Sequence, residues 1–237
     1  MQKDNLKEAM RASANELIEE VSRLTNLFQT NNGSTLGEAI KISLLMLNME
    51  CDKMMSVISL LDNGIKYKIN DVLTRRYSYI SPFPIVRSSY ELMLMHHCLF
   101  VNPKSVEDML VLMNLWKIKG LKQRTKYENN ESKSFLCQKE KDIKYIEELV
   151  DTIKSTDIYK NCKSQFDHAF NTDKLYYFEI IRTDTKPTIK TTSFGDKNLF
   201  DYVFNELKII PAMKNEVVYN YLSLNSHPTR KFAGSPP

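Results

Sequence analysis

The feature that most constrains the fold of this chain is the regular spacing of apolar residues near its N-terminus. Between about residues 5 and 28, and again between 40 and 61, apolar side chains recur at steps of three and four, the spacing of one helix face. The positions are Leu6, Met10, Ala14, Leu17, Val21, Leu24 and Phe28, then Ile40, Leu44, Leu47, Cys51, Met54, Met55, Ile58 and Leu61. An Asn-Asn-Gly turn signal at 31–33 separates the two segments. The pattern predicts that 1–62 forms an antiparallel helical hairpin.

A low glycine content favours helices along the rest of the chain. Only six of the 237 residues are glycine, and tight turns between strands depend on this residue. Further helices are predicted at 82–101, 104–127, 143–153, 157–170, 199–207 and 213–226. Residues 65–79 are predicted to form a helix or a bridging segment. The β-branched and aromatic stretch 175–193 contains Pro187, which predicts irregular structure or a small strand pair.

The predicted fold class is therefore all-α, an up-and-down helical bundle with a small irregular or two-strand insertion near 175–193. A length of 237 residues fits one helical domain that spans 1–237. The last residues, 229–237, are predicted to be a flexible tail.

Charge and targeting signals narrow the functional classes. The formal net charge is +4, and only eight of the 33 basic residues are arginine, whereas nucleic-acid readers usually concentrate arginine in a dense patch. The charged N-terminus is unlike a secretory signal, and no apolar run reaches the roughly 18 residues of a membrane helix. We expect a cytoplasmic protein that does not act at a membrane.

Neither a metal nor a cofactor is expected. The four cysteines lie far apart and form no C-x-x-C pair. His96 and His97 are adjacent, so their side chains point about 100° apart on a helix and cannot chelate one ion as an i, i+4 pair does. A histidine in the core or between helices is the favoured interpretation.

Arg87 and Glu91 stand out on the predicted helix 82–101, which is apolar on nearly every side and reads as a central, buried helix. The two residues are spaced i, i+4 and share one face. Buried charges need partners. Either Arg87 and Glu91 form an ion pair that sets the helix register, which we favour, or Arg87 binds an anion in a pocket where Glu91 is a base.

A second polar stripe lies on the predicted C-terminal helix. Tyr219, Ser223 and His227 step by four and end at Pro228. His227 either gains from the helix dipole when it is protonated or moves protons near neutral pH. A catalytic triad of Ser223, His227 and Glu91 is not favoured, because the chain has neither a G-x-S-x-G elbow nor a glycine loop for an oxyanion hole.

The densest basic stretch is 116–126. Lys117 and Arg124 continue the helix face that is apolar earlier in the same helix. The favoured interpretation is a helix that runs past the core. The alternative is a basic wall beside a site for phosphate or RNA.

Two motifs together resemble a bacterial all-helical family described as a domain of unknown function. They are P-I-V-R-S-S-Y-E, ending at Glu91, and Y-N-Y-L-S-L-N-S-H-P, ending at Pro228. The resemblance covers about 73–228 and implies a helical core, distantly akin to HEPN domains, many of which are metal-independent RNases of toxin or anti-phage systems. It also singles out Arg87, Glu91, Ser223 and His227. The HEPN signature of Arg followed by His after four to six residues is absent from the helix of Arg87.

We therefore expect Arg87, Glu91, Tyr219, Ser223 and His227 to meet as one cluster. Three functions stay open: a non-catalytic or regulatory domain of a defence or stress system, a metal-independent RNase-like effector, and a sensor of a small anionic ligand or nucleotide. In the RNase alternative His227 is the general base and Arg87 holds the phosphate. A homodimer is a further expectation, since long amphipathic helices often bury a remaining face between copies.

Overall fold

The computed structural model describes 2–28, 35–76, 81–126, 133–172, 177–183 and 187–192. These residues are mostly helical, which confirms the all-α fold class. The chain divides into two compact units, of which the first reaches His97 and the second begins at Cys98. The single domain stays a prediction, and the predicted helices beyond 192 lie outside the described residues.

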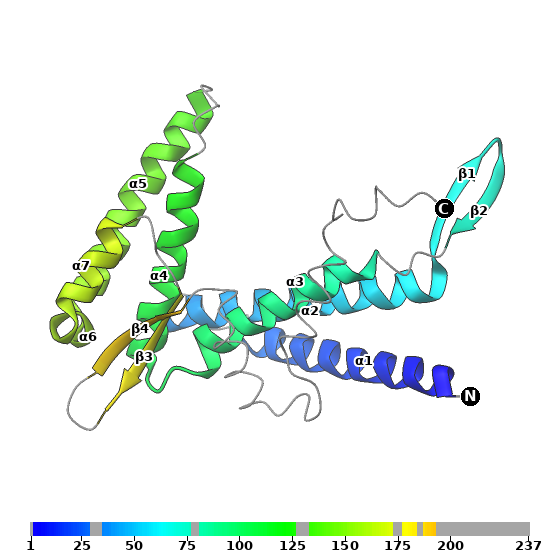
Figure 1. Cartoon of the computed structure of the whole chain (residues 1–237), viewed down its shortest axis with the longest axis horizontal. Helices are drawn as coiled ribbons and strands as arrows, with labels where there is room; N and C mark the ends of the chain where they lie inside the picture. Colours follow the sequence, from blue (N-terminus) through cyan, green and yellow to red (C-terminus); the bar gives the residue numbers. More distant parts are fainter. Residues whose placement is uncertain are drawn as a thin grey trace, which may run out of the picture. The chain divides into compact units, whose positions relative to one another are not determined.

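The first unit is built on three helices, α1 (Gln2–Phe28), α2 (Thr35–Asn63) and α3 (Pro82–His96). Helix α2 packs against both α1 and α3 (Figure 1). An ion pair between Arg11 and Asp62 joins the start of α1 to the end of α2, so these helices run antiparallel. Apolar residues at helical spacing form the core: Ala14, Val21, Ala39, Leu44, Met46, Cys51, Val57 and Leu94. The predicted N-terminal helical hairpin is confirmed.

A β-hairpin follows α2, where a helix or bridging segment was predicted. Helix α2 ends at Asn63, and the next residue, Gly64, has a φ of 61°, which is typical of a residue that stops a helix. Strand β1 (Ile65–Ile69) pairs antiparallel with β2 (Val72–Arg76). Asn70 and Asp71 connect them with φ values of 48° and 66°, which these residue types tolerate and which a two-residue hairpin turn requires. The prediction was wrong. In β1, apolar residues alternate with lysines, and this period of two is that of a strand rather than of a helix.

Helix α3 begins at Pro82 as predicted, and a π-helical turn, η1 (His97–Val101), continues it. Pro82 and Leu94 are its buried residues, and most of the others are partly exposed. The sequence predicted that this helix is buried on nearly every side, and that prediction was wrong. Helix α3 is half-buried, because it packs on α2.

The second unit contains α4 (Val106–Thr125), α5 (Lys133–Lys154), α6 (Asp157–Asn161) and α7 (Lys163–Asn171). Helices α4 and α5 pack as a hairpin (Figure 1). The core of these four helices includes Val111, Leu112, Met113, Leu115, Ile118, Leu149, Ile153, Ile158, Tyr159, Cys162, Phe166 and Ala169. The side-chain oxygen of Ser105 accepts a hydrogen bond from the backbone N–H of Asp108 at 3.1 Å and so caps α4.

Strand β3 (Tyr177–Arg182) pairs antiparallel with β4 (Pro187–Thr192) and packs on α4. The sequence predicted irregular structure or a small strand pair near 175–193, and the structure has the strand pair. Pro187 is the first residue of β4, a position where proline does not interrupt the ladder.

Candidate functional site

Arg87 and Glu91 form the ion pair that their spacing predicts. On α3, the Nε atom of Arg87 donates to Oε1 of Glu91 at 3.1 Å. The Arg87 side chain is 22% exposed and that of Glu91 is 38% exposed. The charge of each residue is thus compensated on its own helix, at a half-buried position.

Helix α2 brings further polar residues to this pair. The hydroxyl of Ser89 donates to Oε1 of Glu50, and Nζ of Lys53 donates to the backbone carbonyl of Ser88 at 2.9 Å. We call Glu50, Lys53, Arg87, Ser89 and Glu91 the α2–α3 polar cluster. It contains two acids and two bases, and its hydrogen bonds link helices that are distant in sequence.

Burial shifts the pKa values of two members of the cluster. Desolvation raises the pKa of the Glu50 carboxyl above its usual value, although Ser89 and Lys53 oppose the shift. Desolvation also lowers the pKa of Lys53, and the nearby carboxylates of Glu50 and Glu91 oppose that change. Perturbed pKa values of this kind gather at binding sites and also in structural ion-pair networks.

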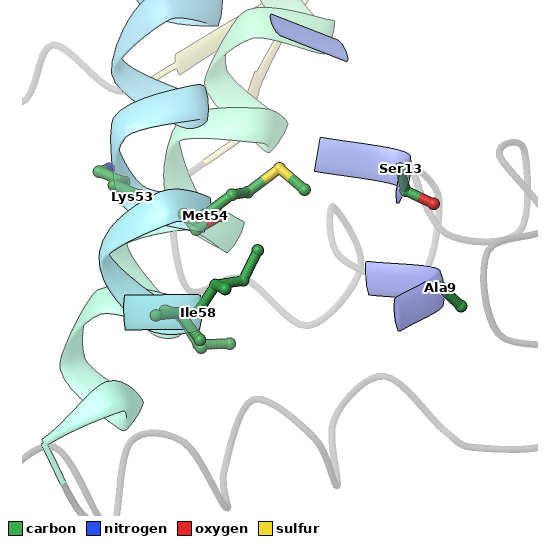
Figure 2. A pocket seen from close by; sticks show the side chains of 8 residues that line it. Ala9, Ser13, Lys53, Met54 and Ile58 are labelled. Carbon is green, nitrogen blue, oxygen red and sulfur yellow. The ribbon is translucent and has the colours of Figure 1, made fainter. Parts of the chain in front are cut away.

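An apolar pocket adjoins the cluster. It has a volume of about 340 Å³ and lies between α1, α2 and α3. Its lining residues are Ala9, Ser13, Lys53, Met54, Val57, Ile58, Val86 and Ser89. Figure 2 shows the side chain of Met54 reaching from α2 toward α1. Lys53 and Ser89 belong both to the pocket and to the α2–α3 polar cluster, and Ser13 of α1 is a third polar residue of the lining.

The predicted five-residue cluster is described only in part. Arg87 and Glu91 meet, whereas Tyr219, Ser223 and His227 lie outside the described residues. Sequence reasoning missed three members of the α2–α3 polar cluster: Glu50, Lys53 and Ser89. A signal was present for two of them, because Glu50 and Lys53 are charged residues three positions apart in a largely apolar helix.

Arg124 and its neighbour Lys122 have structural partners in the second unit. Arg124 forms a bidentate pair with Asp142 of α5, with N–O distances of 2.6 and 2.5 Å. Its hydrogen bonds lower the pKa of the Asp142 carboxyl, which is buried. Lys122 donates to the carbonyl of Phe170 at 2.7 Å, and Lys117 is half-buried. This geometry favours the structural interpretation of the basic stretch over a wall for phosphate or RNA.

His96 links two helices, as the favoured interpretation expected. Its Nε2 atom lies 2.8 Å from the hydroxyl oxygen of Ser43 on α2. Burial, and then the charge of His97, lower the pKa of His96. Within the described ranges, His, Cys, Asp and Glu form no group of three that could hold a metal ion.

The pocket walls are largely apolar, and Arg87 and Glu91 of the adjoining α2–α3 polar cluster compensate each other's charge. None of the helices in the described part of the chain has the length and apolar character needed to span a membrane.

Comparison with protein-family models, with curated proteins and with solved structures finds no match to this chain.

Proposed function

We propose that this chain is a non-catalytic, regulatory helical protein whose first unit binds a small, mostly apolar molecule. The observation that carries the proposal is the pocket between α1, α2 and α3, whose largely apolar lining includes Lys53 and Ser89. Small-molecule sites are typically concave and largely apolar, with a few polar groups that orient the ligand. The pocket has this composition, and Lys53 has a shifted pKa.

The class of ligand follows from the lining. A nucleotide brings several phosphate charges, and apolar walls beside one lysine offer little to compensate them. A molecule with an apolar body and a single polar end group buries its body against Met54, Val57 and Ile58. Its end group then meets Lys53 and Ser89. The sequence suggested a small anionic ligand. The pocket lining favours, within that class, an amphipathic molecule.

Filling the pocket should abolish ligand binding. Met54 lines the pocket, is half-buried and reaches from α2 toward α1 (Figure 2), so Met54→Trp places a larger side chain in this space. Decanol and decanoate are suitable probes, measured by thermal shift. A ligand at about ten times its Kd should stabilise the wild-type protein by about 1.4 kcal/mol, and Met54→Trp should remove this stabilisation.

Met55 supplies the matched control, because it is an exposed methionine of the same helix, α2, and does not line the pocket. The variant Met55→Trp should respond to both probes as the wild-type protein does. Lys53→Met should weaken the response to decanoate more than that to decanol. A wild-type protein that responds to neither probe, or a Met54→Trp variant that responds fully, would contradict the proposal.

We also propose that the protein acts in a bacterial defence or stress system, and only the sequence resemblance supports this part of the proposal. The RNase-like alternative rests on the same resemblance and requires Arg87 to hold a phosphate. The pairing of Arg87 with Glu91 on α3 instead supports a structural role in which the α2–α3 polar cluster joins the two helices.

Expression of the wild-type chain should therefore leave bacterial growth and cellular RNA unchanged.

Arg87→Ala should lower the free energy of unfolding by about 0.5–1 kcal/mol, because the pair is only half-buried. Adding Glu91→Ala should cost little more, because Glu91 has already lost this partner. Growth arrest with RNA cleavage that Arg87→Ala or His227→Ala relieves, in variants that still fold, would favour the RNase-like effector.

A further inference from the structure

A half-buried carboxyl group adjoins the pocket without lining it. The hydroxyl of Ser89, which does line the pocket, donates a hydrogen bond to Oε1 of Glu50. The other oxygen of this carboxyl, Oε2, is buried and has no hydrogen-bond partner within the described ranges. A buried acceptor without a donor is costly. The function proposed above uses Ser89 and leaves Glu50 without a role.

The contact with Glu50 decides what Ser89 can offer a ligand. A serine hydroxyl has one proton to donate and two lone pairs that accept. An ionised carboxylate only accepts, so the proton of Ser89 is committed to Glu50 while Glu50 is charged. In that state Ser89 can accept a hydrogen bond from an alcohol but has no proton for a carboxylate. A protonated Glu50 can instead donate to Ser89, which frees the serine proton for the ligand.

The charges around Glu50 favour its protonation when an anion binds. Desolvation already raises the pKa of the Glu50 carboxyl, and Lys53 opposes this shift. An anionic ligand competes with Glu50 for Lys53 and adds a second negative charge, and both effects raise the pKa further. On α3, Glu91 pairs with Arg87, and α1 contributes only an alanine and a serine to the lining.

We propose that Glu50 determines which end group the pocket binds: a charged Glu50 favours a hydroxyl, and a protonated Glu50 admits a carboxylate. This inference rests on the proposed function, because it needs an amphipathic ligand whose end group meets Ser89. Binding of a carboxylate is then coupled to the uptake of a proton from solvent, which forms an O–H bond on Glu50. Binding of an alcohol takes up no proton. Glu50 is thus a positioning residue that acts through Ser89.

Isothermal titration calorimetry of the full chain with decanoate and with decanol tests the coupling. Titrations in buffers of different ionisation enthalpy count the protons taken up, between about pH 6 and 8, where decanoate is ionised. The wild-type protein should take up a proton with decanoate and none with decanol. Because the complex with decanoate holds the extra proton, its affinity should fall as the pH rises, by up to about tenfold per pH unit. The affinity for decanol should stay constant.

The variant Glu50→Gln removes the titrating group and keeps a donor for Ser89. It should bind decanoate without proton uptake and, at about pH 8, about tenfold more tightly than the wild-type protein, because the like charge is gone. Asp52→Asn is the matched control, since it removes the same charge from an exposed position on α2. It should keep the proton uptake of the wild-type protein. If Glu50→Gln folds poorly, Glu50→Met tests the same loss of uptake.

The outcomes separate this inference from the function on which it rests. Binding of both probes without proton uptake overturns the role of Glu50 and leaves the pocket function standing, whereas binding of neither probe removes both. His96, which contacts Ser43 seven residues away along α2, is present in every variant. Proton uptake that persists in Glu50→Gln therefore belongs to another group and also overturns the inference.

Discussion

Replacement of Arg182 by methionine should lower the free energy of unfolding of the second unit by about 3–5 kcal/mol. Arg182 of β3 forms a bidentate pair with Asp108 of α4, with N–O distances of 2.9 and 2.6 Å. The Asp108 side chain is only 1% exposed. Loss of the guanidinium leaves a buried carboxylate without its main counter-charge, and the carboxylate of Glu107 nearby adds to the repulsion. Urea unfolding measures the change, followed by the fluorescence of Trp116, the single tryptophan of the chain.

Two further variants separate loss of the charge from loss of side-chain packing. Arg182→Lys keeps the positive charge but loses the two-pronged geometry, so its effect should be intermediate. The double variant Arg182→Met/Asp108→Asn removes both charges and should be more stable than Arg182→Met alone. If Arg182→Met changes the stability by less than about 1 kcal/mol, the pair does not anchor β3 to α4.

Replacement of Phe166 by alanine should cost about 3–5 kcal/mol in the same measurement. Phe166 is fully buried, and its ring centroid lies 5.6 Å from that of Tyr159 and 5.9 Å from that of Phe170. Removal of the ring leaves a cavity where α6 meets α7 and also breaks both aromatic contacts. These short helices are held mainly by such packing, because isolated helices of this length are unstable in water.

Ile181 provides the comparison for this prediction. It is an apolar residue of β3 in the same unit, but it is 39% exposed, so Ile181→Ala should cost much less than Phe166→Ala. Phe166→Leu keeps most of the buried apolar volume and should cost about 1 kcal/mol. Equal losses for Phe166→Ala and Ile181→Ala would show that the ring does not hold this part of the core.

The candidate site was predictable only where its contacts stay within one helix. The pair of Arg87 and Glu91 follows from i, i+4 spacing, because a helix brings such residues together whatever surrounds it. The hydrogen bond from Lys53 to Ser88 joins α2 to α3, and it depends on the rotation and register of two packed helices. No local pattern encodes that register. The pocket depends on it too, since its walls come from three helices.

The sequence by itself determined the helical class and the long α1–α2 hairpin, because the period of the apolar residues is a local property of the chain. It left irregular structure and a strand pair open near 175–193. The tertiary structure decided what the polar residues do. Arg124 reaches Asp142 across a helix hairpin, and Asp108 reaches Arg182 over 74 positions of sequence. Both pairs arise because a buried carboxylate needs a counter-charge. Which cation supplies it is decided only when the elements pack.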